Sequence, residues 1–248
     1  MKKIFITLVI LIGATIALQS CKKKEELINN QEFNYSKAGK MHNKILDYYY
    51  TSNINKKVES FEERIDQIDN YLSQTIDQVK PGTFRKIIDE NSTLKERMYS
   101  ITENNNLNMK LLVQEMLKND EISINLFMYL NEITAIYEQN MFDFDNIIDN
   151  LNLLHSRMKN DDSLNQNEKN KLEAVIQISI SSAEYWNSPK NRKFLTQKTL
   201  SLPWYEKDVA GALAGISSGL VLYANSIGPW GGAAALIGSA ALGSAIPD

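Results

Sequence analysis

Few residues of this chain could carry nucleophilic or acid–base chemistry: one cysteine (Cys21), two histidines (His42 and His155) and a serine motif in the tail. Gly215 and Gly219 frame a G-x-S-x-G sequence, the pattern of the nucleophile elbow in serine hydrolases. That elbow needs a strand, a sharp turn, a helix and a histidine downstream. Both histidines lie upstream, and the surrounding small residues repeat with helical spacing. We therefore interpret the match as a chance product of a tail rich in Gly and Ser.

Metal chemistry has little support in the residue types. Two histidines and one cysteine are too few for a thiolate or multi-histidine zinc site. The H-E-x-x-H, EF-hand and P-loop spacings do not occur in the sequence. The chain holds 30 Asp and Glu residues, so an enzyme with a carboxylate-based site stays open as the least favoured function. We expect no catalytic constellation, no metal and no cofactor.

Cys21 has another chemistry open to it, because it ends a segment typical of export signals. Lys2 and Lys3 precede an apolar run over residues 4–18, and Ser20 stands directly before Cys21. The run is shorter than the roughly 20 apolar residues of a spanning helix. The end resembles the lipobox of bacterial lipoproteins. This resemblance implies that residues 1–20 are a signal peptide and that Cys21 carries fatty acids such as palmitate.

Residues 21–35 have the composition of a charged tether. Within them, the stretch Lys24-Glu25-Glu26 resembles the surface-export signal of Bacteroidota lipoproteins. This implies an outer-membrane location, with the periplasmic and the cell-surface face both open. The chain has 27 Lys and Arg residues against 30 Asp and Glu, and Lys2 and Lys3 leave with the signal. This acidic balance, without a basic stripe, argues against a nucleic-acid partner.

Apolar spacing predicts helices through most of residues 36–205. One heptad-like series runs from Val58 to Val79, and a second runs from Phe84 through Asn91 to Ile101. Strand-type alternation is not sustained anywhere. Further helices are expected over residues 36–52, 107–118, 121–158 with a break near 140–145, and from a capping box at Asn165 to Asn187. The sequence therefore predicts an all-α protein, a helical bundle or array.

Residues 206–248 change in character and form the last predicted domain. No charged residue occurs from Val209 to Pro247. Gly211, Gly215 and Gly219 repeat every four residues, as in a glycine zipper, and this spacing suits close helix packing. We expect Asp208 to be the N-cap of the first of two small-residue helices, which form a C-terminal helical hairpin. Burial against protein is the favoured placement of this hairpin, and membrane insertion is the alternative.

Three short stretches resemble a group of uncharacterised Bacteroidota outer-membrane lipoproteins. They are a G-x-x-H-N stretch with His42 and Asn43, an S-x-x-Y-W stretch that ends at Trp186, and a D-x-x-G-A stretch that starts at Asp208. The resemblance implies no activity, but it marks these four residues as candidates for a shared structural contact. Ser163, in Asp162-Ser163-Leu164, resembles the acceptor of the short O-glycosylation site used in that phylum.

These observations favour a lipoprotein that acts as a non-enzymatic binding or interaction module. Its partners are the membrane, through the lipid on Cys21, and a protein or ligand that the sequence does not identify. The alternative is a membrane-active, bacteriocin-like protein that uses the C-terminal hairpin. The oligomeric state is not readable from the sequence.

Overall fold

The computed structural model describes residues 33–53, 60–103, 108–141, 143–191, 204–216 and 230–245. These residues contain helices and no strand, so the predicted all-α class is confirmed. The elements in chain order are η1 (Tyr35–Lys37), α2 (Ala38–Asn53), α3 (Phe61–Thr75), α4 (Thr83–Glu90), α5 (Ser92–Glu103), α6 (Met109–Lys118), α7 (Ile124–Gln139), α8 (Phe144–Lys159), α9 (Gln166–Asn187), α11 (Trp204–Ala214) and α13 (Gly231–Ser244).

Local side-chain chemistry sets several helix ends. Asn165 and Glu168 form the predicted capping box at the start of α9, and α9 ends at Asn187 as expected. Ser60 and Glu63 form a second capping box before α3. The break expected near 140–145 separates α7 from α8.

The second heptad-like series is not one helix, and Asn91 is the reason. Its side-chain Oδ1 accepts a hydrogen bond from the backbone N–H of Leu94 at 2.8 Å. An asparagine that caps in this way starts a new helix more readily than it continues an old one. The series is therefore divided into α4 and α5, with Asn91 between them.

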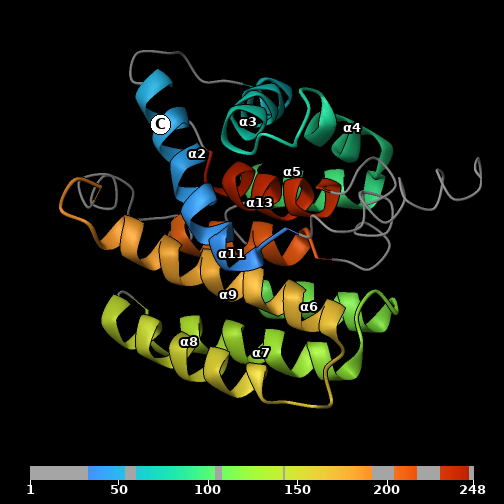
Figure 1. The fold of residues 1–248 in the computed structure, drawn as a ribbon, viewed down its shortest axis with the longest axis vertical. Coiled ribbons are helices and arrows are strands. Elements are labelled where there is room, and N and C mark those ends of the chain that lie inside the picture. The colour runs from blue at the N-terminus through green and yellow to red at the C-terminus, as the bar shows by residue number, and fades with distance from the viewer. Residues whose placement is uncertain are drawn as a thin grey trace, which may run out of the picture. The chain divides into compact units, whose positions relative to one another are not determined.

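Helix α13 forms the centre of the core. Every residue from Gly231 to Ser244 is buried, which suits a helix that has no polar face. Helix α11 packs along it, and α2, α3, α4, α5 and α9 also contact it (Figure 1). The described part of the tail therefore lies inside protein, which is the placement that the sequence favoured.

Helices α11 and α13 run antiparallel at very close range. A Cβ added at Gly211 would lie 2.2 Å from the carbonyl oxygen of Ser239, and one added at Gly243 would lie 2.3 Å from that of Lys207. A Cβ at Gly215 would lie 2.9 Å from the Cα of Leu236. Only glycine leaves room for backbones at this distance. The segment that joins the two helices lies outside the described residues.

The chain divides close to the predicted end of the tether at residue 35 and does not divide before residue 206. Its two compact units are Met1–Phe33 and Asn34–Asp248. The expected boundary between residues 36–205 and 206–248 falls inside the second unit, because α11 and α13 fill the space between the earlier helices. A tail that supplies the core cannot be a separate domain.

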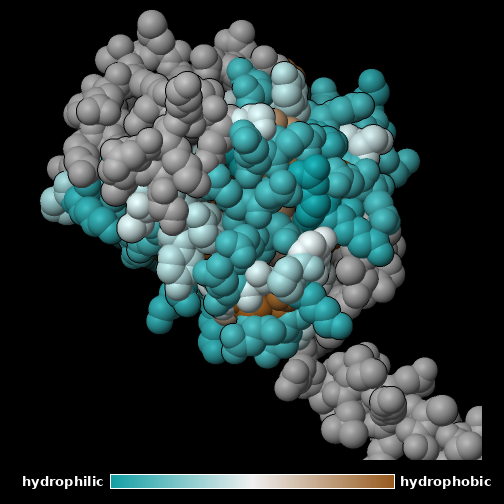
Figure 2. All heavy atoms as spheres, turned by 90° about the horizontal axis from the view of Figure 1, so that it is seen from above, coloured by the Kyte–Doolittle hydropathy of each residue, from teal (hydrophilic) through white to brown (hydrophobic). Residues whose placement is uncertain are grey.

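Helices α7 and α8 lie at the outside of the second unit. They pack on each other and on α9, and α7 also packs on α6 (Figure 1). The face drawn in Figure 2 is predominantly hydrophilic, as expected for amphipathic helices that turn their apolar side inward. Among the described residues, no helix combines the length and the apolar character that crossing a bilayer requires.

Candidate functional site

The four residues expected to share a contact do come together. Asp208 of α11 accepts hydrogen bonds on Oδ2 from the Trp186 indole N–H at 2.9 Å and from the Ser182 hydroxyl at 2.5 Å, both on α9. His42 of α2 places Nε2 3.4 Å from Asp208 Oδ1. Asn43 lies beside His42, with its Oδ1 3.0 Å from His42 Nδ1. We call these five residues the buried polar centre, in which Asn43 is half-buried and the other four are fully buried.

Asp208 is not the N-cap that the sequence predicted. Helix α11 begins at Trp204, so Asp208 lies inside the helix. Its carboxylate instead binds groups on α9 and α2 and joins the tail to two earlier helices. A buried carboxylate needs such partners, and they outweigh the local preference for a cap.

The hydrogen bonds of Asn43 orient its amide beside His42. The Asn43 amide donates to the carbonyl of Ser181 at 2.8 Å, which turns its Oδ1 toward His42. Because Oδ1 only accepts, His42 Nδ1 carries a proton. His42 Nε2 faces Asp208 Oδ1 at 3.4 Å, and neither atom has a hydrogen-bond partner among the described residues.

This geometry joins helices α2, α9 and α11. The side chains of His42 and Asp208 have no exposed surface. In a nucleophilic triad the histidine lies between serine and carboxylate. Here Ser182 donates directly to the carboxylate, so its hydroxyl is not activated by His42. Ser182 is missing from the predicted contacts, although its four-residue spacing from Trp186 puts both on one helix face.

A second buried carboxylate lies next to the centre in the sequence. Burial, with a smaller contribution from the charge of Glu138, raises the pKa of Glu206 to about 7. A raised carboxylate pKa is one mark of general acid–base sites. Glu206 does not line the groove beside Arg157 or the groove beside Arg97.

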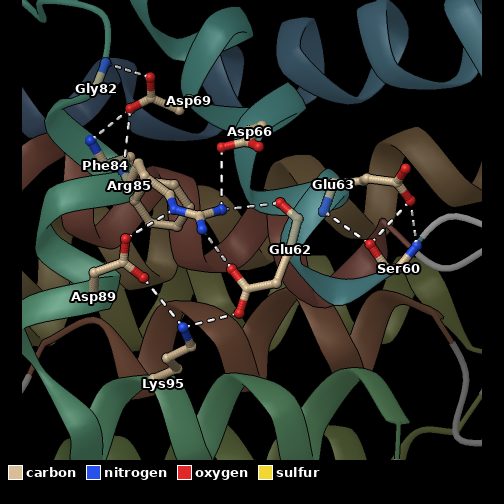
Figure 3. A network of polar contacts seen from close by, with 10 residues as sticks. All are labelled: Ser60, Glu62, Glu63, Asp66, Asp69, Gly82, Phe84, Arg85, Asp89 and Lys95. Carbon is tan, nitrogen blue, oxygen red and sulfur yellow. Dashed lines mark hydrogen bonds and ion pairs between the residues drawn. The ribbon is translucent and has the colours of Figure 1, made fainter.

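A network of charged side chains connects α3, α4 and α5 (Figure 3). The guanidinium of Arg85 pairs with Glu62, Asp66 and Asp89, and the ammonium of Lys95 pairs with Glu62 and Asp89. Hydrogen bonds to Glu62 and Asp89 raise the pKa of Lys95. Each charge has an opposite partner, so the network is suited to holding the three helices together.

Asp69 completes this region from a buried position. Its carboxylate accepts hydrogen bonds from the backbone N–H groups of Gly82, Phe84 and Arg85 (Figure 3). Gly82 precedes α4 at a φ of 84° and offers no side chain for capping. Asp69 therefore caps α4 from a distant part of the chain, which no local pattern could predict.

The outer surface carries a groove of about 740 Å³ between α7 and α8. Met128, Tyr129, Glu132 and Arg157 line it together with the loop residues Asn160, Asp161 and Asp162. Asp162 is exposed, whereas Asp161 accepts a hydrogen bond from the Tyr129 hydroxyl at 2.7 Å.

The same outer layer holds most of the large apolar side chains that face water. Six described residues of this kind are exposed, and four of them lie on or beside α7 and α8: Ile124, Met128, Met141 and Leu153. Large apolar residues grouped on one exposed layer mark interaction sites more often than scattered ones do.

The remaining predicted residues lie in several environments. Gly211 and Gly215 contact α13, as described above, whereas Cys21 and Gly219 lie outside the described residues. Ser163 is exposed in the turn between α8 and α9. His155 pairs with Glu173 across α8 and α9 and not with the buried polar centre.

The described residues contain no convergent group of three or more His, Cys, Asp or Glu side chains that could hold a metal ion. Comparison with known proteins found no matching family model, no similar curated protein and no similar solved structure.

Proposed function

We propose that the protein is an outer-membrane lipoprotein, anchored through lipid on Cys21, that acts as a non-enzymatic binding module. The observation that carries this proposal is the contrast between the inside and the outside of the described structure. The buried polar centre is closed to solvent and joins α2, α9 and α11. The outer layer of α7 and α8 offers an open groove and exposed apolar side chains.

Exposed apolar groups of this kind are costly in water and gain free energy when a partner covers them. Ile124 and Met128 are one helical turn apart on α7, and Leu153 lies on α8. A partner that covers both helices would remove these side chains from water.

The test is amine-reactive crosslinking of intact cells that make the lipidated full-length chain. The outer-layer variant Met128→Glu with Leu153→Glu removes two exposed apolar contacts without touching the core. The control is Leu111→Glu, because Leu111 is also more than half exposed but lies on α6. We expect one discrete adduct in the wild type and in the control, and its loss in the outer-layer variant. An adduct that survives in the outer-layer variant would remove the support for binding at α7 and α8.

A membrane-active protein is the second candidate, and the enclosure of α13 favours it. Helix α13 has no charged residue, and six amphipathic or small-residue helices surround it. A bundle of this design could hold an apolar helix in soluble form until it opens. However, α13 has 14 residues and would extend only about 21 Å, which is less than the ~30 Å of a bilayer core.

Dye release from vesicles separates the two candidates. Binding alone predicts that the chain without its acyl group leaves dye-filled anionic vesicles intact at neutral and at acidic pH. Release of dye at low protein-to-lipid ratio would favour the membrane-active function.

A further inference from the structure

We propose that the groove between α7 and α8 binds a lysine or arginine side chain presented by a segment of a partner protein. The positive end of that side chain meets Asp161 and Asp162, and its aliphatic stem lies against Met128. This inference deepens the proposed binding function and rests on it.

The groove offers more negative than positive charge. Three carboxylates, those of Glu132, Asp161 and Asp162, line it together with one guanidinium, that of Arg157. Arg157 is already engaged, because it pairs with Glu132 and lies 5.5 Å from the centre of the Tyr129 ring. The two aspartates therefore dominate the charge that an incoming group would meet.

Asp161 is held in place and kept charged. The Tyr129 hydroxyl donates to its Oδ2 at 2.7 Å, and the Ser163 backbone N–H donates to its Oδ1 at 2.8 Å. Hydrogen bonds from Ser163 and Tyr129 lower the pKa of Asp161. Burial and Asp161 raise the pKa of Tyr129, so its hydroxyl keeps the proton that it donates. A fixed carboxylate of this kind suits recognition of a cation.

Asp162 is exposed and has no ion-pair partner among the described residues. The charge of Lys169 makes a small contribution to lowering the pKa of Asp161, but its ammonium donates to the carbonyl of Lys159 at 3.2 Å. The C-terminal end of α8 also lies here, and the partial negative charge of a helix C-terminus favours cations. An anionic group would be repelled by the two aspartates and by the C-terminal end of α8.

The apolar wall selects a long side chain over a bare cation. Met128 lines the groove and exposes 62 % of its surface, whereas Ile124, one turn before it on α7, is exposed outside the lining. Lysine and arginine carry aliphatic stems that pack on apolar surface while their charged ends stay polar. Methionine is a flexible partner for such stems. A protein segment with a basic residue flanked by apolar residues therefore fits both parts of the groove.

The test uses the purified chain and a fluorescein-labelled octapeptide of alternating lysine and leucine, with a glutamate–leucine octapeptide as the opposite-charge probe. The groove variant is Asp161→Asn with Asp162→Asn. The control variant is Asp145→Asn with Asp149→Asn, which makes the same change of charge on exposed positions near the other end of α8. Thermal melting checks that both variants remain folded.

We expect fluorescence anisotropy to show binding of the lysine peptide only, weakened about tenfold or more by the groove variant and less than about twofold by the control. Equal loss in both variants would overturn the proposal, because general charge attraction would then explain the binding. Absence of lysine-peptide binding would also overturn the groove proposal. If the crosslinked adduct of the outer layer is still found in that case, the proposed binding function stands, but with another ligand. If the chain associates with itself and the groove variant abolishes that association, the groove binds a second copy of the chain and the proposed partner segment is overturned.

Discussion

Gly211→Ala tests whether the tail is packed inside protein as the structure describes. The added Cβ would lie 2.2 Å from the carbonyl oxygen of Ser239 and 2.9 Å from the Cα of Ala240. Both are backbone atoms, so neither can rotate away. The two helices must therefore separate by about an ångström or bend, and overpacking of this kind costs about 1–3 kcal/mol.

Helix propensity offsets part of this overpacking cost. Alanine is a better helix former than glycine by about 1 kcal/mol in a helix interior. Because the clash is with backbone along a fully buried interface, we expect the upper part of the overpacking range and a net loss of about 2 kcal/mol. For a domain of this size, that loss lowers Tm by about 4–8 °C.

Two further glycines make the test specific. Gly215→Ala should cost less than Gly211→Ala, since its Cβ would lie 2.9 Å from the nearest atom. Gly82 has open space around it but a φ of +84°, so Gly82→Ala and Gly82→Leu should cost about 1 kcal/mol each, independent of side-chain size. At Gly211, leucine should be far worse than alanine.

The assay is urea denaturation followed by circular dichroism, on the chain without its signal and acyl group. A net stabilisation of about 1 kcal/mol by Gly211→Ala would show helix propensity alone, and would refute the close packing of α11 on α13. Equal costs for alanine and leucine at Gly211 would contradict it as well.

Three other predictions follow from the described residues and the sequence. Asp208→Ala should destabilise the chain by about 3 kcal/mol, because Ser182, Trp186 and His42 would stay buried without their carboxylate partner. A loss below about 1 kcal/mol in urea denaturation would contradict this prediction. Glu206 has a pKa of about 7 in the folded chain against an ordinary value of 4.5, so its protonated form favours folding. The free energy of unfolding should fall by on the order of 2 kcal/mol between pH 4.5 and 7, which is less than the full shift implies because the group is partly solvated. Glu206→Gln should remove that fall in thermal melts across this pH range. Cys21→Ala should abolish labelling by a fatty-acid probe and release the protein from the membrane fraction, and continued labelling would show that the acyl site lies elsewhere.

Local chemistry explains where the sequence predicted the fold well. The capping box of Asn165 and Glu168, and the break between α7 and α8, depend on residues close in the chain. Asn91 shows the limit of apolar spacing, because the heptad-like series continues through it while its side chain caps a new helix. Apolar spacing alone does not determine whether Asn91 continues the helix or caps a new one.

The candidate site was only partly predictable because its contacts join distant segments. The motifs around His42, Trp186 and Asp208 pointed to a shared contact, but local preference alone assigned Asp208 to a helix cap. The cap of α4 by Asp69, and the groove in which Tyr129 meets Asp161, arise from the packing of separate helices. A single sequence contains no periodic signal for such pairs.

Hydrogen exchange of the lipidated protein in isolated outer-membrane vesicles, compared with the same protein in detergent, separates binding by the outer layer from release of the tail. Binding through the outer layer predicts slower exchange in the membrane, confined to peptides from residues 124–163, with α11 and α13 equally protected in both samples. Faster exchange in α11 and α13, with residues 124–163 unchanged, would mean that the tail leaves the core in the membrane and that the outer layer binds no partner there.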